Sequence, residues 1–248
     1  MIDFSKISQK SLIGKILRGI LKIIPRNSVL PILQGRLKSK KWIIGSGVLS
    51  YWLGTYEIEK QRLFGKIVKN DDIVYDIGAH VWFYTLLASE LVGGKGKVFS
   101  FEPNPRNIFY LRKHIALNNF KNIMVFEAAV SEKSGTALFN LQKDNFSGGR
   151  IGLREGGFNV KTVALDDLVV SEKLPLPNII KIDIEGGEFA VLKGATGILE
   201  KYRPVIFLAT HDEENHKNCL NFLELLGYKL KAIGGENIER AGEFLAYF

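Results

Sequence analysis

The sequence of 248 residues has little of what marks a secreted, membrane-spanning or thiolate-metal protein. Its single cysteine, Cys219, excludes a disulfide within the chain and a cluster of thiolate metal ligands. Because Cys219 lies in a helical pattern, we expect it to be a small core residue. A transmembrane helix needs about 20 nearly uninterrupted apolar residues, and the sequence contains no such run. These absences favour a cytoplasmic protein, and no metal ligand set is predicted.

Nucleic-acid recognition also lacks a sequence signature. The net charge of +8 is compatible with a nucleic acid, an anionic membrane or an acidic glycan. However, the basic residues are spread along the chain, and no segment interleaves them with aromatic residues as RNA-binding motifs do. We therefore expect no nucleic-acid partner.

Residues 10–24 form the clearest amphipathic pattern. Seven apolar residues recur at helical spacing, basic residues lie opposite them, and Pro25 ends the pattern. Charges interrupt the apolar run and no small-residue cleavage site follows, so this is not a signal peptide. Two interpretations remain open. The helix either lies in the interface of a membrane, at its inner face, or packs on the domain or on a second subunit of a homodimer.

The centre of the chain is a strand, a tight turn and a helix. Residues 73–77 are apolar around Asp76 and predict a buried strand, and Gly78 begins the turn. Residues 83–91 predict the helix that follows. Its N-terminus offers free backbone N–H groups to a ligand at the carboxyl edge of the sheet. We therefore place the candidate active site at this edge.

The next strand, residues 97–102, indicates which ligand this site takes. It ends in Glu102, and a carboxylate at this position can accept hydrogen bonds from both ribose hydroxyls of an adenosine. The glycine pattern G-x-G-x-x-G of dinucleotide-binding proteins is absent from this stretch. Asp76 and Glu102 are instead the acidic pair expected of a site for S-adenosylmethionine (SAM).

At these residues the chain resembles the FkbM-type SAM-dependent methyltransferases. The segments that carry the resemblance follow in the order of that family: DIGAHVWFYTLLAS from Asp76, FSFEPNP at 99–105, TVALDDL at 162–168 and IIKIDIEGGEFAVLKGA at 179–195. The resemblance covers about Tyr51 to Phe248. It implies SAM as cofactor, with contacts at the following residues: Asp76, Gly78, Ala79, His80, Trp82, Glu102, Pro103, Asn104 and Ala129.

Two residues depart from the usual family pattern, DIGANxGFYT. His80 stands where the family has asparagine, and Trp82 stands where it has its last glycine. An indole carries about 150–250 Å² of surface. If Trp82 turns into the pocket it excludes SAM, and if it turns back against the helix the pocket survives with a reshaped wall.

Candidate catalytic groups follow the fourth and fifth core strands, at residues 178–183 and 204–209. Asp183, Glu185 and Glu188 come at the end of the first, and the second delivers His211 to the same edge. Either the carboxylates act as a general base or they bind a divalent cation. We expect His211 or Glu185 to be the base and Asp183 to orient it. His114 and His216 fall in predicted helices and are expected at the surface.

Further elements complete the predicted sheet. Residues 123–130 predict its third strand, 185–199 a helix, and 227–233 with 243–248 a closing antiparallel pair. Residues 25–41 are interpreted as a linker or short helical pieces. Residues 136–141 and 160–165 predict two added strands around a polar loop, 142–150. In that loop Asn145, Ser147 and Arg150 are candidates for acceptor recognition.

The predicted fold is therefore α/β and Rossmann-like, the class I methyltransferase fold. It has a seven-stranded, mostly parallel sheet with helices on both faces. We expect an N-terminal helical extension over residues 1–56 and the methyltransferase domain over 57–248. The predicted activity is SAM-dependent O-methyl transfer to a hydroxyl of a sugar, glycan or glycolipid. The alternative is a catalytically silent binding module whose pocket is filled by Trp82.

Overall fold

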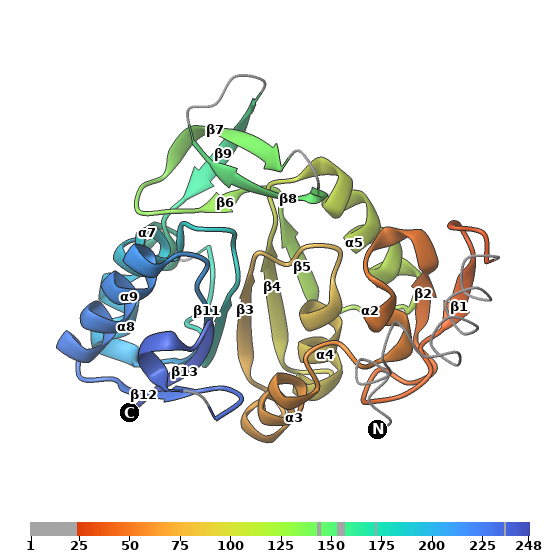
Figure 1. Ribbon diagram of the computed structural model, residues 1–248, viewed down its shortest axis with the longest axis horizontal. Helices are drawn as coiled ribbons and strands as arrows, with labels where there is room; N and C mark the ends of the chain where they lie inside the picture. Colours follow the sequence, from red (N-terminus) through yellow and green to blue (C-terminus); the bar gives the residue numbers. More distant parts are fainter. Residues whose placement is uncertain (1–23, 143–144, 153–156, 172, 236) are drawn as a thin grey trace.

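A seven-stranded sheet forms the centre of the computed structural model, which describes residues 24–142, 145–152, 157–171, 173–235 and 237–248 (Figure 1). The predicted helix at 10–24 therefore falls almost wholly outside the described residues. The strand order is β12-β13-β11-β10-β3-β4-β5; β13 pairs antiparallel with both β11 and β12, and the other neighbouring pairs are parallel. The strands span β3 Ile73–Ile77, β4 Lys97–Phe101, β5 Ile123–Phe126, β10 Ile179–Ile182, β11 Val205–Ala209, β12 Lys229–Ala232 and β13 Glu243–Tyr247.

Both faces of this sheet are covered, which explains why its central strands are almost wholly apolar. Alternate residues of one strand enter different cores: Tyr75 and Ile77 pack on one side, Val74 on the other. The helices α6 Leu165–Val170, α7 Glu188–Lys193, α8 Thr196–Tyr202 and α9 Glu213–Leu225 contribute to the first core, and α3 Ile58–Ile67 and α4 Phe83–Val92 to the second. The first core includes Cys219, which is buried as expected.

The predicted helix over 185–199 is wrong at its start and in its middle. Gly186 and Gly187 make a turn, and both backbone N–H groups donate to the Glu188 carboxylate, so α7 begins only at Glu188. The break before α8 occurs at Gly194, where an added Cβ would lie 2.2 Å from the Ser131 carbonyl oxygen. The close approach of two backbones therefore ends the helix.

The segment after residue 24 is not the linker that its prolines indicated. It forms an antiparallel pair, β1 Val29–Pro31 and β2 Lys41–Ile43, followed by a 3₁₀ turn, Ile44–Ser46, and helix α2 Leu49–Leu53. Trp42, Tyr51 and Trp52 are buried in the same cluster as residues of α4. The predicted domain boundary near residue 57 stays a prediction.

A second, four-stranded sheet lies over the carboxyl edge of the large one (Figure 1). Its order is β6-β9-β7-β8, with β6 Ala129–Val130, β7 Gly135–Gln142, β8 Asn145–Ile151 and β9 Phe158–Val163. Two predictions are corrected here. The strand expected over 123–130 divides into β5 and β6, which belong to different sheets, and most of the loop expected over 142–150 is strand β8.

Helix α5, Pro105–Leu117, begins as its sequence predicts, with Asn104 as N-cap and Pro105 in the first turn. His114 on this helix is wholly buried, and His216 on α9 is also buried, so the surface positions expected for both are wrong. His114 accepts from the backbone N–H of Ile43 at Nε2, while Nδ1 contacts the carbonyl of Val81. None of the described helices is long and apolar enough to cross a membrane.

Candidate active site

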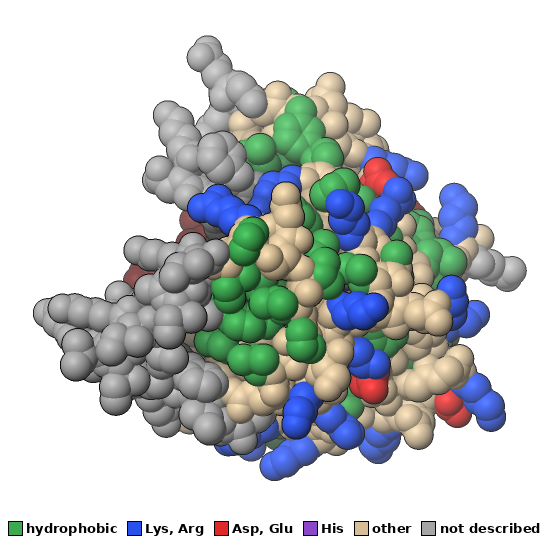
Figure 2. Space-filling model, turned by 90° about the vertical axis from the view of Figure 1, so that its right-hand side faces the viewer, with side chains coloured by type: hydrophobic (Ala, Val, Ile, Leu, Met, Phe, Trp, Pro, Cys, Tyr) green, Lys and Arg blue, Asp and Glu red, His purple; other side chains and the backbone are tan. Residues whose placement is uncertain are grey.

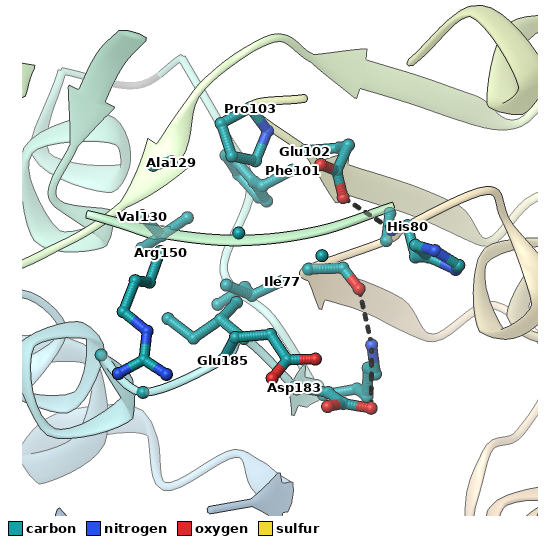
Figure 3. A pocket seen from close by; sticks show the side chains of 18 of the residues that line it. Ile77, His80, Phe101, Glu102, Pro103, Ala129, Val130, Arg150, Asp183 and Glu185 are labelled. Carbon is teal, nitrogen blue, oxygen red and sulfur yellow. Dashed lines mark hydrogen bonds and ion pairs between the residues drawn. The ribbon is translucent and has the colours of Figure 1, made fainter. Parts of the chain in front are cut away.

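A cavity of about 520 Å³ opens where the two sheets meet, a volume within the usual range of small-molecule sites. Its wall includes the turn after β3, the end of β4, the start of β6, strand β8 and the segment after β10. Of the predicted site residues, it contains Gly78, Ala79, His80, Glu102, Pro103, Ala129, Asp183 and Glu185. Figure 3 shows Glu102 and Pro103 on one side of the cavity and Asp183 and Glu185 on the opposite side.

Glu102 is fixed by three hydrogen bonds from the chain around it. Oε2 accepts from the backbone N–H of His80 at 2.8 Å, and Oε1 accepts from Asn104 N at 2.9 Å and Asn107 Nδ2 at 3.3 Å. Burial raises the pKa of Glu102 to about 7, against the lowering effect of these hydrogen bonds. Each carboxylate oxygen accepts about two hydrogen bonds, so Oε2 keeps an acceptor position for a ligand's hydroxyl group.

Asp76 lies beneath the cavity, where its carboxylate contacts other side chains of the protein and not the cavity. Thr85 Oγ1 donates to Asp76 Oδ2 at 2.6 Å, and Lys181 Nζ lies 3.1 Å from Oδ1. Lys181 also donates to the Gly78 carbonyl at 2.9 Å. Gly78 has φ +77°, and an added Cβ would lie 2.0 Å from the Asp183 carbonyl oxygen, so this turn requires glycine.

On the other side, a histidine lies between two carboxylates. His211 Nδ1 is 2.7 Å from Glu188 Oε1, and Nε2 is 3.6 Å from Asp183 Oδ1. Glu188 is wholly buried and also accepts from Asn215 Nδ2. The hydrogen bond with Glu188 raises the pKa of His211, burial opposes this, and Asp183 adds to it.

Asp183 faces the cavity with several cations behind it. Lys60 Nζ and Lys181 Nζ lie 3.8 and 3.9 Å from Asp183 Oδ2. Burial alone would raise the pKa of Asp183, but Lys181, Lys60 and His211 hold it below its ordinary value. Lys60 itself is 1% exposed and also contacts Glu243 at 2.7 Å and Glu57 at 3.1 Å. Asp183 therefore presents a fixed negative charge to the cavity.

Trp82 turns away from the cavity. Its indole is wholly buried and stacks on Trp42, with ring centroids 4.8 Å apart, and on His114 at 4.4 Å. Its φ of +123° lies in the region that favours glycine. His80 (φ +53°) does line the cavity, with Nδ1 3.4 Å from Tyr51 Oη. Burial and the nearby Lys181 lower the pKa of His80 to about 4, so it is neutral at pH 7.

Replacing Trp82 with glycine is expected to destabilise the fold without improving SAM binding. Losing a buried indole costs about 3–5 kcal/mol, whereas relief of the positive φ returns only about 1–3 kcal/mol. We therefore expect a net loss of about 2 kcal/mol and a Tm lower by about 4–8 °C. Calorimetry at a temperature where both proteins are folded should give SAM affinities within about threefold. A gain of tenfold or more in Trp82→Gly, absent in Trp82→Phe, would show that the indole blocks the pocket.

His211 gives a pH-dependent contribution to stability. Its folded-state pKa lies above the ordinary 6.5, so the stabilisation is complete below pH 6.5 and is lost as the pH rises through the folded-state pKa. We expect the Tm advantage of the wild type over His211→Asn to shrink between pH 6 and pH 9. Differential scanning calorimetry across this range tests it. A constant advantage would mean that the two carboxylates do not hold a proton on His211.

Four predicted site residues are not part of the described cavity wall: Asp76, Trp82, Asn104 and His211. Asp76 is held under the floor by Thr85 and Lys181, and Trp82 by its ring stack. Asn104 caps α5 through its side chain, which accepts from Arg106 N at 3.0 Å. His211 lies behind Asp183. Of the acceptor candidates, Arg150 reaches the cavity wall, while the side chains of Asn145 and Ser147 lie outside what the structure describes.

Sequence reasoning missed the two buried lysines. Lys181 lies inside an apolar strand, IIKI, and a charge in a strand buried on both faces is the signal that it needs a partner. Lys60 gives no such signal, because its helix carries other charges. Within the described ranges, no group of three or more His, Cys, Asp or Glu side chains is arranged to hold a metal ion.

Comparison with known proteins places this geometry among methyltransferases. The model of the methyltransferase FkbM domain matches residues 76–230. The chain is 31% identical over 145 residues to the hexuronic acid methyltransferase AglP of Haloferax volcanii, a match that covers 58% of this chain and 59% of that protein. The chain thus spans about three fifths of the length of this curated relative.

Two solved structures share the fold. The methyltransferase FkbM of Methylobacillus flagellatus KT superposes with a TM-score of 0.53 and 16% identity, over 82% of this chain and 56% of that one. The precorrin-6y C5,15-methyltransferase of Geobacter metallireducens GS-15 superposes with a TM-score of 0.50 and 18% identity, over 77% and 89%. The seven-stranded sheet, with its closing antiparallel pair, is the class I methyltransferase fold that the sequence predicted.

Proposed function

Because this chain belongs to the FkbM methyltransferase family, whose model covers more than half of it, we propose that it transfers a methyl group from SAM to a hydroxyl of an acidic sugar. The observation that carries this proposal is the cavity wall. It places the buried carboxylate of Glu102 on one side and the carboxylates of Asp183 and Glu185 on the other. The Glu102 side suits a nucleoside cofactor, and the side with Asp183 and Glu185 suits the acceptor.

The chemistry of the Glu102 side fits SAM. A carboxylate with a remaining acceptor position suits a ribose hydroxyl. The apolar Pro103, Ala129 and Val130 next to it suit the flat adenine ring. Lys181, whose ammonium is held by Asp76 and Gly78, supplies positive charge for the carboxylate of the methionine part. When bound, SAM supplies a methyl group on a sulfonium centre, which an oxygen nucleophile accepts.

The protein's remaining task is to orient the acceptor and remove its proton. Asp183 is the group that we assign to this task, since it is on the cavity wall and is held ionised by its neighbours. His211, expected to be the base, lies behind Asp183 with one nitrogen engaged by Glu188. We therefore assign His211 as a positioning residue for Asp183. Glu185 remains the alternative base.

Arg150 is the feature that favours an acidic sugar. It belongs to β8 and lines the same cavity as Glu185 (Figure 3). A guanidinium binds a carboxylate through two parallel hydrogen bonds. The similarity to a hexuronic acid methyltransferase supports the same substrate class. We propose that Arg150 holds the carboxylate of a uronic acid while one of its hydroxyls faces Asp183.

A methyl-transfer assay tests this proposal. Glucuronoside and glucoside acceptors that differ only at C6 are offered with SAM, and the product is analysed by mass spectrometry. We expect the glucuronoside to be preferred at least tenfold by kcat/KM, and Arg150→Gln to remove most of this preference. A methylated product that releases methanol in mild alkali would be an ester and would contradict transfer to a hydroxyl.

The alternative of a silent binding module loses its premise. It required the Trp82 indole to fill the pocket, and the indole stacks on Trp42 and His114 instead. The cavity between Glu102 and Asp183 is therefore not closed by Trp82.

A further inference from the structure

One face of the protein combines exposed apolar side chains with basic ones. Figure 2 shows this face, the side on which β1, β2, α2 and α5 lie in Figure 1, with apolar side chains gathered between lysines and arginines. A shallow groove runs between the β1–β2 pair and α5, and its wall includes Val29, Ile43, Phe109, Tyr110, Lys113 and Leu117. We call this groove and its surroundings the β1–α5 face.

The apolar part of this face is open to solvent. Val29 on β1 is 45% exposed and Phe109 on α5 is 52% exposed. Lys113 lies over the Phe109 ring at 4.2 Å, and the Arg106 guanidinium lies over the Tyr110 ring at 5.0 Å. Long basic side chains that lie along aromatic rings can keep their charges at a polar surface while the rings enter an apolar one.

Basic side chains outnumber acidic ones on the β1–α5 face (Figure 2). No aspartate or glutamate occurs between Asp3 and Glu57, or between Glu102 and Glu127. Residues 24–56 and 103–126, which build the face, together contain nine lysines and arginines. Arg26 and Lys41 beside the groove and Lys113 within it are exposed. Residues 1–23 are also basic, with a net charge of +4, whereas the remainder of the chain carries a net charge of −5.

These observations select the partner. A second copy of the chain would bring an equally basic face against this one, which like-charge repulsion opposes. A nucleic acid would suit the cations but would gain little from Val29 and Phe109. A bilayer with anionic headgroups suits both, because apolar side chains enter the acyl boundary while lysines and arginines contact phosphates.

We propose that the β1–α5 face docks on the surface of a membrane that contains anionic lipids. The face also adjoins the active site. Val48, which precedes α2 and follows β2 by five residues, is 52% exposed and lines the catalytic cavity. Docking would therefore bring the mouth of the cavity near the headgroups. This inference does not depend on the methyl-transfer reaction.

Sedimentation of the full chain with lipid vesicles tests the proposal. Vesicles of phosphatidylcholine alone are compared with vesicles that contain about 30% phosphatidylglycerol, at low and high salt. We expect binding only to the anionic vesicles, and weaker binding at high salt. Val29→Ser with Phe109→Ser should lower the partition coefficient about tenfold, and Lys41→Gln with Lys113→Gln about fivefold for each cation removed.

A matched control separates this face from general hydrophobicity. Val170 and Leu225 are 82% and 85% exposed and lie outside the face, so Val170→Ser with Leu225→Ser should bind like the wild type. All variants change exposed side chains, and unchanged Tm values check their folding. A further variant, Ile16→Ser with Ile20→Ser, reports on residues 10–24. The proposal is wrong if the two double variants of the β1–α5 face bind like the wild type while Ile16→Ser with Ile20→Ser loses binding, or if all variants bind alike. Equal binding to neutral and anionic vesicles would also contradict it.

Discussion

Replacing Glu102 with alanine is expected to weaken SAM binding by at least tenfold. The carboxylate is fixed by three hydrogen bonds and lines the cavity, so its remaining acceptor position, on Oε2, can accept from a ribose hydroxyl without rearrangement. A hydrogen bond to a charged group contributes about 1.5–3 kcal/mol, which corresponds to about tenfold or more. Titration calorimetry with SAM and with its demethylated product measures the loss.

The pH dependence of SAM binding provides a second test of Glu102. The ribose hydroxyl needs the ionised carboxylate as its acceptor, and burial raises the pKa of Glu102 to about 7. The affinity of the wild type for SAM should therefore rise with pH up to about pH 7–8 and fall roughly tenfold per unit below about pH 6. Glu102→Gln keeps the shape of the side chain but should show a weaker affinity without this slope. If Glu102→Gln binds SAM as the wild type does, Glu102 does not hold the ribose.

Replacing Asp183 with asparagine is expected to lower kcat by about 10²- to 10⁴-fold, the usual contribution of a positioned proton acceptor. SAM affinity should stay within about threefold, because Asp183 lies across the cavity from Glu102. The amide keeps the size of the side chain but cannot take the proton of the acceptor hydroxyl. Single-turnover rates with the glucuronoside acceptor separate this loss from binding.

Glu185→Gln is the matched control for Asp183. Both carboxylates line the cavity, and both variants remove one negative charge at constant shape. We expect Glu185→Gln to retain kcat within about tenfold and to act mainly on KM for the acceptor. The reverse pattern, with kcat lost in Glu185→Gln and kept in Asp183→Asn, would move the base to Glu185. His211→Asn should lie between the two, as expected of a positioning residue.

The sequence alone predicted those strands whose formation depends on a local apolar run. Four strands are short apolar runs that end at the carboxyl edge of the sheet: β3, β4, β10 and β11. They lie within the ranges that the sequence predicted for them, 73–77, 97–102, 178–183 and 204–209. The places of Gly78 and Glu102 on the cavity wall were predictable for the same reason, because both residues directly follow strand ends. The resemblance to a known family added the order of these segments.

The features that the sequence left open or did not reveal depend on contacts between distant segments. The orientation of Trp82 is decided by Trp42 and His114, which are 40 and 32 residues away in the chain. Similarly, Lys60 finds its shortest ion pair with Glu243, 183 residues later. Residues 29–31 and 41–43 contain only three paired residues each, too few for a periodic pattern.

The ion pair between Lys60 and Glu243 has a consequence for the order in which the protein matures. Lys60 emerges from the ribosome early, whereas Glu243 belongs to β13, which is inserted between β11 and β12 only after both of its neighbours have been synthesised. Until β13 is in place, the Lys60 ammonium lacks Glu243, its partner at 2.7 Å. Lys60, which lies 3.8 Å from Asp183, is then not yet fixed by that ion pair. The edge of the sheet that carries Glu102 can therefore form before β13 is made, whereas the surroundings of Asp183 are complete only when β13 is in place.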